Sequence, residues 1–577
     1  MHLQNHRERV QRQLLAALSV LLTTAALCAA AALGCAGDRS RGRPGTDAIP
    51  GTALDRFRPD ELLRIEVEMA DEDWETLRWQ GRSLPRVYAG CFEFDGYTDF
   101  DAEVTINGET AQGAAVRKKG FLGSLSATRP SLKIDFGRGK AHRGRTLHGT
   151  RRLTLNNNKQ DLSNVRQCLS YALFAKAGIK APRCSWAHVT AQGKDLGVYS
   201  RVEPIKRPFL LRAFGDARGN LYEGQVSDFN TGRLSTFELK TNKQQNDRSD
   251  LDAVVQALET GDTEVWDALD EVVDMKAFLT FWAMEVLVGH WDSYSGNQNN
   301  FYLYRDPKDH RFRFIPWGTD GAFAARPNER SGVLPQSVFL GSELTARLWR
   351  VARARDRYVE RLRQLMDDLW DEDLLDAEVE RIGRLTGAPA PQLDLIKTFV
   401  NQRQAQIERE LEGGVPPWPE APQRSERVCR PPPATSGTFE LVWTDSHSYA
   451  PGGRFAFDLR VGGRRLAIDR DLYCAAGPVQ EPDDPTYGVP RIAFTGVDSS
   501  TGRKFWVGLY VPEVQWREGE IPFHGYETFG VIVELFPSGG YRRLAVIGDG
   551  TLTLEQAGHS NGAVVKGRWD GRVATTR

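Results

Sequence analysis

The chain has 577 residues, more than one domain of ordinary size, so two or three domains are expected. Hydrophobic residues make up 40% and charged residues 26%, an ordinary globular composition that can build sizeable cores. A formal net charge of −1 provides no overall basic field, so we expect no nucleic-acid partner, and seven cysteines do not indicate a disulfide scaffold.

The N-terminus has the pattern of a bacterial secretory signal. A basic head precedes an apolar run from Leu14 to Gly34, which ends in the residues ALGC and resembles a lipobox. We therefore expect residues 1–35 to be a lipoprotein signal peptide, with lipidation at Cys35 attaching the chain to a membrane. Because Ala36 follows, resemblance to sorted lipoproteins favours the bacterial outer membrane or cell surface. The alternatives are a secreted or periplasmic protein with a simple signal peptide, or an uncleaved membrane anchor.

Five cysteines follow this segment, so at least one is unpaired if the others form disulfides. In an oxidising exterior, a disulfide between Cys429 and Cys474 would pin a linker onto the C-terminal part of the chain, and we predict that pair. None of the five lies in a C-x-x-C spacing with histidine partners, so the sequence indicates no zinc site.

The globular part begins near residue 54. Residues 36–53 are rich in Gly, Arg, Asp and Pro, which predicts a flexible tether. Residues 62–78 predict a strand followed by a short helix. Residues 98–120 predict a hairpin whose turn is Asn107-Gly108.

The stretch from Arg117 to Lys133 has the composition of a phosphate-binding segment. Gly120 and Gly123 let the backbone approach a phosphate that a Cβ would obstruct. Lys133 alternates with apolar residues in the following strand, so its side chain points away from the core, toward whatever the glycine-bearing loop covers. We predict Lys133 as a phosphate-binding lysine, with Arg117 and Lys119 as further nucleotide-binding residues, although only alternate members of the run can point into a cleft. The alternative for Lys133 is a solvated strand face, because most lysines are exposed.

Residues 151–179 predict a strand, a polar turn and an amphipathic helix, and residues 185–205 predict another hairpin. The last strand of that hairpin leads to Glu203. A carboxylate there is placed to form the ion pair that positions the nucleotide-binding lysine. The alternative is a surface salt bridge of little consequence.

Three helices are predicted at residues 251–258, 264–269 and 275–289. The last is almost wholly apolar, so we expect it in the core, with its C-terminal end directed at the loop that contains Asp292. Glu285 within it is expected to be paired or at a helix boundary rather than catalytic.

The Asp292 loop has the H-x-D-x-x-x-x-N spacing, from His290 to Asn297, of a phosphoryl-transfer catalytic loop. Two β-rich runs joined by a polar turn follow and predict a hairpin, and Asp320-Gly321 comes directly after it. In this order, one carboxylate can face a substrate hydroxyl while an Asn and a second carboxylate hold magnesium on the phosphates. The alternative is that these residues only form turns, because Asp and Asn bond their own backbone there.

The rest of the chain divides into three parts. Amphipathic helices are predicted at residues 343–370, 374–385 and 392–411, and a Pro-rich linker at residues 415–436. Short alternating runs between turns make residues 437–577 an all-β domain, a sandwich or barrel, and we expect it to be sandwich-like. This part carries no nucleophile–base pair or His/Glu cluster, so we expect it to bind protein or glycan, or to act as a spacer.

Five blocks in order resemble the spore-coat protein H (CotH) kinase family: VRKKGFLGS…RPSLKIDF, LTLNNNKQDLSNVRQCLSYALFAKAGI, LGVYSRVEPI, VLVGHWDSYSGNQNNFYLY and RFIPWGTDGAF. The resemblance implies a bilobal, atypical protein-kinase-like α+β domain over residues 54–414. It also implies use of ATP and Mg²⁺ to phosphorylate serine or threonine in proteins. It assigns roles by position to six residues: Asp292 as the catalytic base, Asp320 as a metal ligand, Asn297 or Asn300 as a second metal or phosphate contact, Lys133 as the phosphate-binding lysine and Glu203 as its partner.

One position departs from the family pattern. The metal motif of the family often reads Pro-Trp-Asp-x-Asp, whereas this chain has Gly318 at the first acidic position, so Asp320 alone remains. We expect a membrane-tethered protein Ser/Thr kinase; the alternative is a catalytically inactive kinase-like surface protein with a structural or adhesive role. A metal-dependent hydrolase using Asp292 and Asp320 ranks last, because the sequence has no His/Asp ligand cluster for two metals.

Overall fold

The computed structural model describes residues 57–91, 96–138, 142–324, 335–419, 421–445, 453–479, 488–524, 526–537 and 540–576. The expected signal peptide, its lipidation site Cys35 and the expected tether lie outside these residues. Within them, no helix combines the length and the apolar character needed to cross a bilayer.

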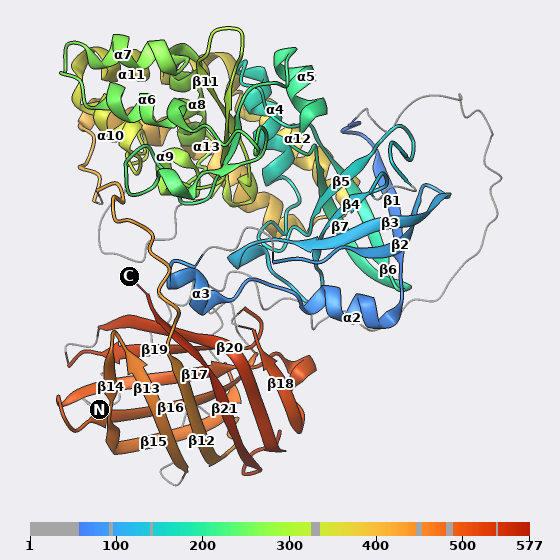
Figure 1. The fold of residues 1–577 in the computed structure, drawn as a ribbon, viewed down its shortest axis with the longest axis vertical. Coiled ribbons are helices and arrows are strands. Elements are labelled where there is room, and N and C mark those ends of the chain that lie inside the picture. The colour runs from blue at the N-terminus through green and yellow to red at the C-terminus, as the bar shows by residue number, and fades with distance from the viewer. Residues whose placement is uncertain are drawn as a thin grey trace.

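The first strands of the chain close into a barrel (Figure 1). Its strands follow the order β1-β2-β3-β4-β5-β7-β6, and the barrel closes where β1 runs parallel to β6. Alternate residues of each strand fill it, as Leu63, Ile65 and Val67 do in β1. The predicted turn Asn107-Gly108 joins β2 to β3 with positive φ angles of 48° and 90°. The bounds are β1 (Leu62–Glu68), α2 (Asp71–Trp79), α3 (Leu84–Tyr88), β2 (Phe100–Ile106), β3 (Glu109–Lys119), η1 (Leu122–Ser124), β4 (Ser131–Asp135), β5 (Arg152–Asn156), β6 (Cys184–Ala191) and β7 (Lys194–Val202).

The register of three neighbouring strand pairs decides which side chains leave the barrel. Arg117 of β3 lies opposite Lys133 of β4, Lys133 opposite Thr154 of β5, and Thr154 opposite Val202 of β7. Residues directly opposite one another share a face of a sheet. Val202 packs into the core of the helical part of the chain, whereas Leu132, next to Lys133, packs inside the barrel. Lys133 therefore leaves the barrel on the side of the helices.

The middle of the chain forms a four-stranded sheet, in the order β11-β10-β8-β9, and the helices that accompany it (Figure 1). Every residue of α8 from Phe278 to Leu287 is buried, as expected for the apolar core helix. The helix predicted over residues 343–370 is divided in two at Val351. The bounds are α4 (Arg166–Lys176), α5 (Arg207–Phe214), β8 (Leu221–Gly224), η2 (Leu234–Thr236), β9 (Glu238–Leu239), α6 (Ser249–Leu258), α7 (Val265–Val272), α8 (Met275–Leu287), α9 (Tyr294–Asn297), β10 (Phe301–Arg305), β11 (Phe312–Pro316), η3 (Thr319–Gly321), α10 (Glu343–Arg350), α11 (Ala352–Leu369), α12 (Glu372–Thr386) and α13 (Ala390–Gly413).

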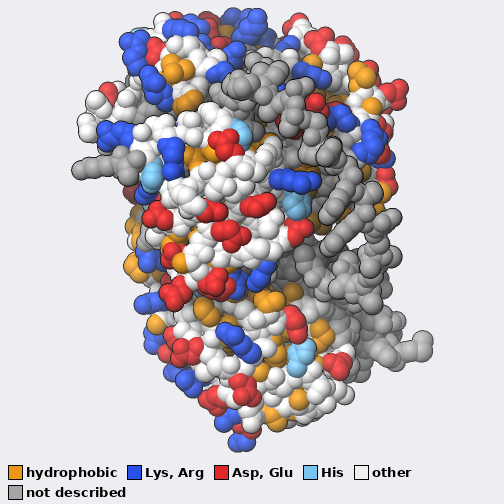
Figure 2. All heavy atoms as spheres, turned by 90° about the vertical axis from the view of Figure 1, so that its right-hand side faces the viewer, with side chains coloured by type: hydrophobic (Ala, Val, Ile, Leu, Met, Phe, Trp, Pro, Cys, Tyr) orange, Lys and Arg blue, Asp and Glu red, His pale blue; other side chains and the backbone are white. Residues whose placement is uncertain are grey.

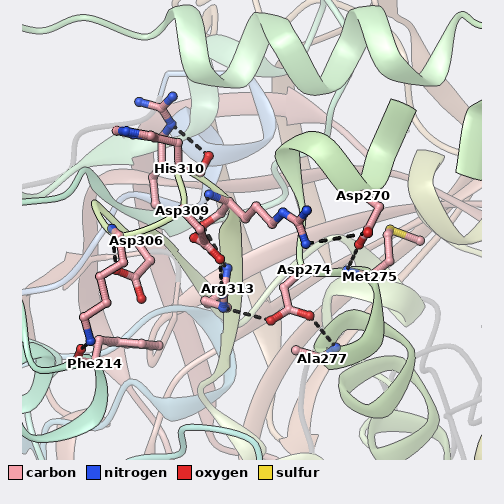
Figure 3. A network of polar contacts seen from close by, with 12 residues as sticks. Phe214, Asp270, Asp274, Met275, Ala277, Asp306, Asp309, His310 and Arg313 are labelled. Carbon is pink, nitrogen blue, oxygen red and sulfur yellow. Dashed lines mark hydrogen bonds and ion pairs between the residues drawn. The ribbon is translucent and has the colours of Figure 1, made fainter. Parts of the chain in front are cut away.

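Polar contacts tie the β10–β11 hairpin to the N-terminus of α8 (Figure 3). Arg313 of β11 forms ion pairs with Asp274 at 3.0 Å and with Asp309 in the hairpin turn at 2.6 Å. Asp274 also caps α8, because its carboxylate accepts a hydrogen bond from the N–H of Ala277 at 3.0 Å. The C-terminal end of α8 leads to one predicted acid and the end of β11 leads to the other. The network therefore holds the two elements that carry the predicted acids in a fixed relation.

The C-terminal strands form one continuous sheet of ten strands (Figure 1). The order is β14-β13-β12-β21-β20-β19-β17-β16-β15, with β18 beside β20, and a bridge between Trp443 and Ala476 brings its two sides together. The predicted all-β character is observed, whereas a two-sheet sandwich is not confirmed, because the sheet is continuous and barrel-like. Two runs that the sequence separates, RRLAVIG and TLTLEQ, belong to the single strand β20. The bounds are β12 (Ala434–Val442), β13 (Arg454–Val461), β14 (Arg464–Leu466), β15 (Ile468–Pro478), β16 (Pro490–Asp498), β17 (Arg503–Tyr510), η4 (Glu513–Gln515), β18 (Gly519–Phe523), β19 (Phe529–Leu535), β20 (Tyr541–Ala557) and β21 (Val564–Thr575).

Among the cysteines that the structure describes, two disulfides are formed, Cys91–Cys429 and Cys168–Cys184. The predicted pair Cys429–Cys474 is wrong, because Cys474 is unpaired and buried in the core of the C-terminal sheet. The linker that carries Cys429 instead runs beside the loop after α3. There the N–H of the next linker residue donates to the carbonyl two residues before Cys91 at 3.1 Å.

Helix α3 packs on the outer face of the C-terminal sheet, against β20 and β21. Its residues Leu84 and Tyr88 form a hydrophobic cluster with Trp506, Tyr510 and Phe529 of the sheet. The disulfide and this cluster thus attach the sheet to the segment that follows β1 and α2.

The surface carries both signs of charge. On the face drawn in Figure 2, acidic side chains gather across the middle of the molecule, and basic side chains are most numerous toward its upper end. This face therefore has no field of one sign, in keeping with the net charge of −1.

Candidate active site

Lys119 and Lys133 leave the barrel on the side of the helical part, and both side chains are partly exposed. Burial lowers the pKa of Lys133 to about 7, and the charges of Lys119 and Arg117 lower it further, while Glu223 opposes them. Burial also lowers the pKa of Lys119, whose ammonium group donates to Oδ1 of Asn156. Cationic groups crowded together in this way are suited to binding an anion such as a phosphate.

Glu203, the predicted partner of Lys133, is engaged elsewhere. Its carboxylate binds Arg183 at 2.9 Å and Arg212 at 2.6 Å, and the side chain is almost fully buried. Glu203 follows the end of β7, on the opposite face to the row that contains Lys133. The carboxylate that acts on Lys133 is Glu223 of β8.

Glu223 belongs to a compact set of charges beside Lys133. Lys240 lies 2.7 Å from its carboxylate and 2.9 Å from that of Glu238. Burial would raise the pKa of Glu223, but Lys240 and Lys133 together lower it to about 2. Glu223 is therefore ionised and stabilises positive charge on Lys133. Sequence reasoning does not single out this residue, because its strand has four residues and begins a polar, irregular stretch.

Arg117 shares the face of Lys133 but is directed toward a different group. Its guanidinium lies 4.0 Å from the carboxylate of Asp99, just before β2. Of the predicted cofactor-binding residues, Lys119 and Lys133 are therefore brought together, Arg117 lies beside them, and Glu203 does not join them.

The segment that joins β3 to β4 is held by the polar turn after β5. The side chain of Asn157 donates to the carbonyl groups of Ser124 at 3.0 Å and Arg129 at 2.6 Å. The ammonium group of Lys159 donates to the carbonyl of Leu125 at 2.6 Å. The turn NNNK, which the sequence shows only as a polar connection, thus supports the predicted phosphate-binding segment.

Glycine is favoured at two positions of this segment for different physical reasons. Gly120 has a φ of 130°, a region that residues with a Cβ rarely adopt, and its carbonyl accepts the Tyr97 hydroxyl at 2.7 Å. A Cβ on Gly123 would lie 2.4 Å from Nε2 of Gln160. A Cβ at position 123 would therefore have to displace the end of the Gln160 side chain, which belongs to the supporting turn.

Asp292 lies in the loop between α8 and α9, and three asparagines surround its carboxylate. Asn297 donates to Oδ1 at 2.7 Å and Asn300 to Oδ2 at 2.8 Å. Asn299 donates to both oxygens at 3.3 and 3.2 Å. These donors orient the carboxylate, and their amide oxygens remain available to other groups. The sequence predicts Asn297 and Asn300 near Asp292 but does not single out Asn299.

Asp320 lies in the short helix η3 after β11. Burial raises its pKa to about 6, the positive charge of Lys119 lowers it, and the negative charges of Asp292 and Asp161 raise it further. These mutual effects place Lys119, Asp292 and Asp320 in one electrostatic cluster. Lys119 comes from the barrel and the two acids come from the helical part.

Two contacts join the segments that carry the two acids, and a third ties the Asp320 segment to α4. His290 Nε2 hydrogen-bonds the carbonyl of Trp317 at 3.1 Å, and burial lowers the pKa of this histidine to about 4, so the neutral ring donates. The N–H of Phe323 donates to the carbonyl of Val288 at 2.7 Å. From the helix that follows the polar turn, Arg166 donates to the carbonyl of Ala322 at 2.7 Å.

Two buried carboxylates support the Asp292 loop from the core. Glu285 accepts the N–H groups of Tyr294 at 3.2 Å and Ser295 at 3.0 Å, and burial raises its pKa to about 8. Asp228 accepts the Tyr294 hydroxyl at 3.0 Å and the Gln298 amide at 2.6 Å, and burial raises its pKa to about 7. Glu285 is paired within the core, as its apolar helix predicts, whereas the sequence shows no sign of Asp228.

The donor set around Asp292 and Asp320 fits a magnesium ion shared with a nucleotide. Across the described residues, no three His, Cys, Asp or Glu side chains come together as a complete ligand set. Mg²⁺ is usually bound by one or two carboxylates, with phosphate oxygens and water completing the shell. Asp292 and Asp320 are close enough to repel each other and are both partly exposed, and the amide oxygens of Asn297 and Asn300 lie at the same loop.

Comparison with known proteins places this arrangement in a family. A family model described as CotH kinase protein matches residues 116–412, slightly more than half of the chain. The inner spore coat protein H of Bacillus subtilis (strain 168) is 24% identical over 247 residues, which cover 41% of this chain and 67% of that protein.

Two solved structures show weaker likeness. The Helicobacter pylori proinflammatory kinase CtkA matches at 11% identity over 52% of this chain and 94% of its own, with a TM-score of 0.26. The Shewanella oneidensis MR-1 HipA, HipB and operator DNA complex contains a chain that matches at 13% identity over 62% of this chain and 74% of its own, also with a TM-score of 0.26. The assignment rests on the family model, whose match includes every candidate site residue from Arg117 to Asp320: this chain belongs to the CotH kinase family.

Proposed function

We propose that this chain is a protein kinase that transfers the γ-phosphate of ATP to serine or threonine hydroxyls of a protein substrate, with Mg²⁺ as cofactor. The observation that carries the proposal is the electrostatic cluster of Lys119, Asp292 and Asp320, with Lys133 near enough to Lys119 for their charges to interact. It places phosphate-binding cations from the barrel against two acids from the helical part. Positioning and charge stabilisation of this kind account for most of the catalysis of phosphoryl transfer.

Lys133 and Lys119 supply the positive charge for the phosphates. Burial lowers the pKa of both lysines in the free protein, and the charge of a bound anion would oppose that shift and favour their protonated forms. Glu223 holds Lys133 from the side that faces the helical part and is itself fixed by Lys240.

Asp292 is the group that accepts the proton of the substrate hydroxyl as its oxygen attacks the γ-phosphorus. The bond between that phosphorus and the β,γ-bridging oxygen breaks, and ADP leaves with the electron pair. Asn297 and Asn300 keep the carboxylate oriented. The substrate hydroxyl needs a free lone pair on the Asp292 carboxylate. It would obtain one by replacing the hydrogen bonds from Asn299, which are the longest of those that the carboxylate accepts from the three asparagines.

Asp320, with an amide oxygen of Asn297 or Asn300, would hold Mg²⁺, which when bound neutralises charge on the phosphates. The partners that complete the proposal are a protein acceptor and a membrane reached through lipid on Cys35, at the bacterial outer membrane or cell surface. The C-terminal sheet is proposed to contact a protein or glycan.

The test is binding followed by transfer. Calorimetric titration of the chain with ATP and Mg²⁺ should give saturable binding that chelation of Mg²⁺ abolishes. Incubation with labelled ATP and an acceptor protein should then place phosphate on serine or threonine, as phosphopeptide mass spectrometry would show. Binding without transfer to any acceptor, including the chain itself, would count against a kinase.

One observation favours a second function, a kinase-like surface protein without turnover. Gly318 occupies the first acidic position of the family's metal motif, and it has a φ of 54°. A Cβ there would lie 2.5 Å from Oδ1 of Asn300, so an acid at this position would clash with the Asn300 side chain. A chain with this function would show no nucleotide-dependent rise in thermal stability but would retain binding to cell surfaces.

A further inference from the structure

A loop of the C-terminal sheet, between β18 and β19, reaches the barrel. The hydroxyl of Tyr526 donates to the carbonyl of Trp79 at 2.8 Å, at the end of α2. It also accepts the ammonium group of Lys118 at 3.1 Å, and the same ammonium group lies over the Tyr526 ring. His524 stacks on Trp79 with ring centroids 5.7 Å apart. This loop therefore contacts the barrel through directed polar and aromatic interactions.

Lys118 occupies an exceptional position for a lysine. It is fully buried, and its ammonium group donates to the carbonyl of Arg78 at 2.6 Å as well as to Tyr526. Successive residues of a strand point to opposite faces, so Lys118 faces away from Arg117 and Lys119. Fixing Lys118 on one face consequently fixes the backbone that presents Lys119 on the other.

The next residue of the same loop reaches the segment between β3 and β4. Glu527 accepts the N–H of Ala127 at 2.7 Å, and Ala127 is fully buried. Burial lowers the pKa of Lys118 and of Lys159, and the negative charge of Glu527 opposes this shift in both. Lys159 in turn holds the same segment, through the carbonyl of Leu125.

We propose that Tyr526 and Glu527 are positioning residues for nucleotide binding, so that the C-terminal sheet is a working part of the phosphate site. They hold Lys118, next to Lys119, and Ala127, within the segment that separates Lys119 from Lys133. Neither residue touches the cluster of acids and lysines itself. The inference rests on the proposed function, because it states what sets the affinity of that site for ATP.

The segment is also held by residues of the barrel part itself. Loss of the contacts from the C-terminal sheet should therefore weaken its order without abolishing it. Tyr97 and Asn157 hold Gly120 and Ser124 without any help from the C-terminal sheet. Loss of Glu527 should therefore loosen the segment and leave the barrel folded. Nucleotide affinity should fall, whereas the chemical step, which depends on the acids of the helical part, should change little.

The test uses the full chain with three substitutions at the loop. Glu527→Ala removes the acceptor, Glu527→Gln keeps an acceptor oxygen but removes the charge, and Tyr526→Phe removes the hydroxyl but keeps the ring. A hydrogen bond to a charged acceptor typically contributes enough for about a tenfold effect. We expect Glu527→Ala to raise the KM and Kd for ATP about tenfold and leave kcat within about twofold. Glu527→Gln should recover most of the affinity.

A matched pair of glycine variants tests the same contact from the barrel side. A Cβ on Gly81 would lie 2.3 Å from Cε1 of Tyr526, whereas a Cβ on Gly96 would have no neighbour within 4 Å. Gly81→Ala should displace Tyr526 and weaken ATP binding, and Gly96→Ala should behave as the wild type.

Hydrogen exchange of residues 120–129 without nucleotide gives a readout that does not depend on activity. Exchange should quicken in Glu527→Ala, and Glu527→Gln should restore protection. Unchanged exchange in Glu527→Ala, or unchanged ATP affinity despite faster exchange, would overturn the positioning role. A wild-type chain that binds no ATP would instead overturn the proposed function, and with it the link to affinity, while the exchange result would still show whether the sheet holds the segment.

Discussion

The ammonium group of Lys119 and the carboxylate of Asp320 lie close enough for each to shift the pKa of the other. Lys119 is the last residue of β3 in the barrel, and Asp320 lies in η3 of the helical part. This pair marks the point at which the two parts of the CotH domain bring opposite charges together.

Loss of either acid should have a different consequence. Asp320→Ala removes the proposed metal carboxylate, so Mg²⁺-dependent binding of ATP should be lost in a calorimetric titration. Asp292→Ala removes the proposed proton acceptor, so turnover should fall by about 10²–10⁴ while ATP still binds. Asp262→Asn is the control, because this carboxylate of the helical part is 75% exposed and forms an ion pair with Arg347. Transfer at the wild-type rate in both acid variants would exclude these roles.

The three asparagines around Asp292 should be unequal in importance. Asn300 donates to the carboxylate at 2.8 Å and to the Asp292 carbonyl at 3.0 Å, whereas the contacts of Asn299 are 3.2 and 3.3 Å. Asn300→Ala should therefore lower kcat at least tenfold by releasing Asp292, an effect of about 1.4 kcal/mol. Asn299→Ala should change kcat less than about threefold, because the substrate hydroxyl takes its place. A larger loss in Asn299→Ala would contradict this order.

Binding of ATP should depend on pH through Lys133. Its pKa of about 7 in the free protein means that the ammonium group loses its proton as the pH rises through neutrality. Phosphate charge raises the pKa of a bound lysine, so binding takes up a proton in this range. Affinity should therefore be highest below pH 7 and fall as the pH rises above it.

Calorimetry in buffers of different ionisation enthalpy measures how many protons are exchanged when ATP binds. It therefore checks whether binding takes up a proton. Lys133→Arg is the matched control, because arginine stays protonated throughout this range. The arginine variant should lose most of the pH dependence that the wild type shows between pH 7 and 9, whatever its absolute affinity. An identical pH slope in both proteins would mean that Lys133 does not carry the charge.

Local pattern was sufficient to predict part of this site. The alternation around Lys133 places its side chain outside the barrel, and the apolar run of α8 places that helix in the core with Asp292 at its end. These features depend on residues close together in the sequence, where strand and helix periodicity determine the outcome.

Partners from distant segments could not be predicted in the same way. Glu223, rather than Glu203, acts on Lys133, because β8 belongs to the sheet of the helical part and its approach to the barrel depends on the whole packing. Cys429 meets Cys91 for a similar reason: the path of the linker decides the pair, and spacing along the chain does not. Tyr526 lies more than four hundred residues from Lys118, and no local signal relates them.

Gly318 should resist replacement by the acid that the family motif carries. Its φ is 54°, and a Cβ would lie 2.5 Å from Oδ1 of Asn300. Gly387 is the matched control, because its φ is 67° but a Cβ there would meet nothing within 4 Å. Gly387→Ala should lower the free energy of unfolding by about 1 kcal/mol, from backbone strain alone.

Gly318→Ala should lower the free energy of unfolding more than Gly387→Ala does. The double variant Gly318→Ala, Asn300→Ala should recover the difference between the two, as measured by denaturant unfolding. Gly318→Asp should likewise destabilise the chain and add no Mg²⁺ affinity. An equal loss of unfolding free energy in Gly318→Ala and Gly387→Ala would contradict this. It would mean that the Asn300 side chain moves away from the new Cβ at no cost in stability.

The Cys91–Cys429 disulfide should stabilise the attachment of the C-terminal sheet. It joins residues 338 positions apart, so it restricts the unfolded chain more than Cys168–Cys184, whose cysteines are 16 apart. Removal of a native disulfide typically lowers the free energy of unfolding by about 2–5 kcal/mol, and the longer loop favours the upper end of that range. Replacing both Cys91 and Cys429 by serine should lower the midpoint of thermal unfolding and speed proteolysis of the Pro-rich linker, whereas the same change at the other pair should leave linker cleavage unaffected. Mass spectrometry of unreduced peptides would first establish which cysteines are paired. Cys474 should react with an alkylating reagent only after unfolding, because it is buried. A peptide that joins Cys474 to Cys429 would contradict this disulfide arrangement.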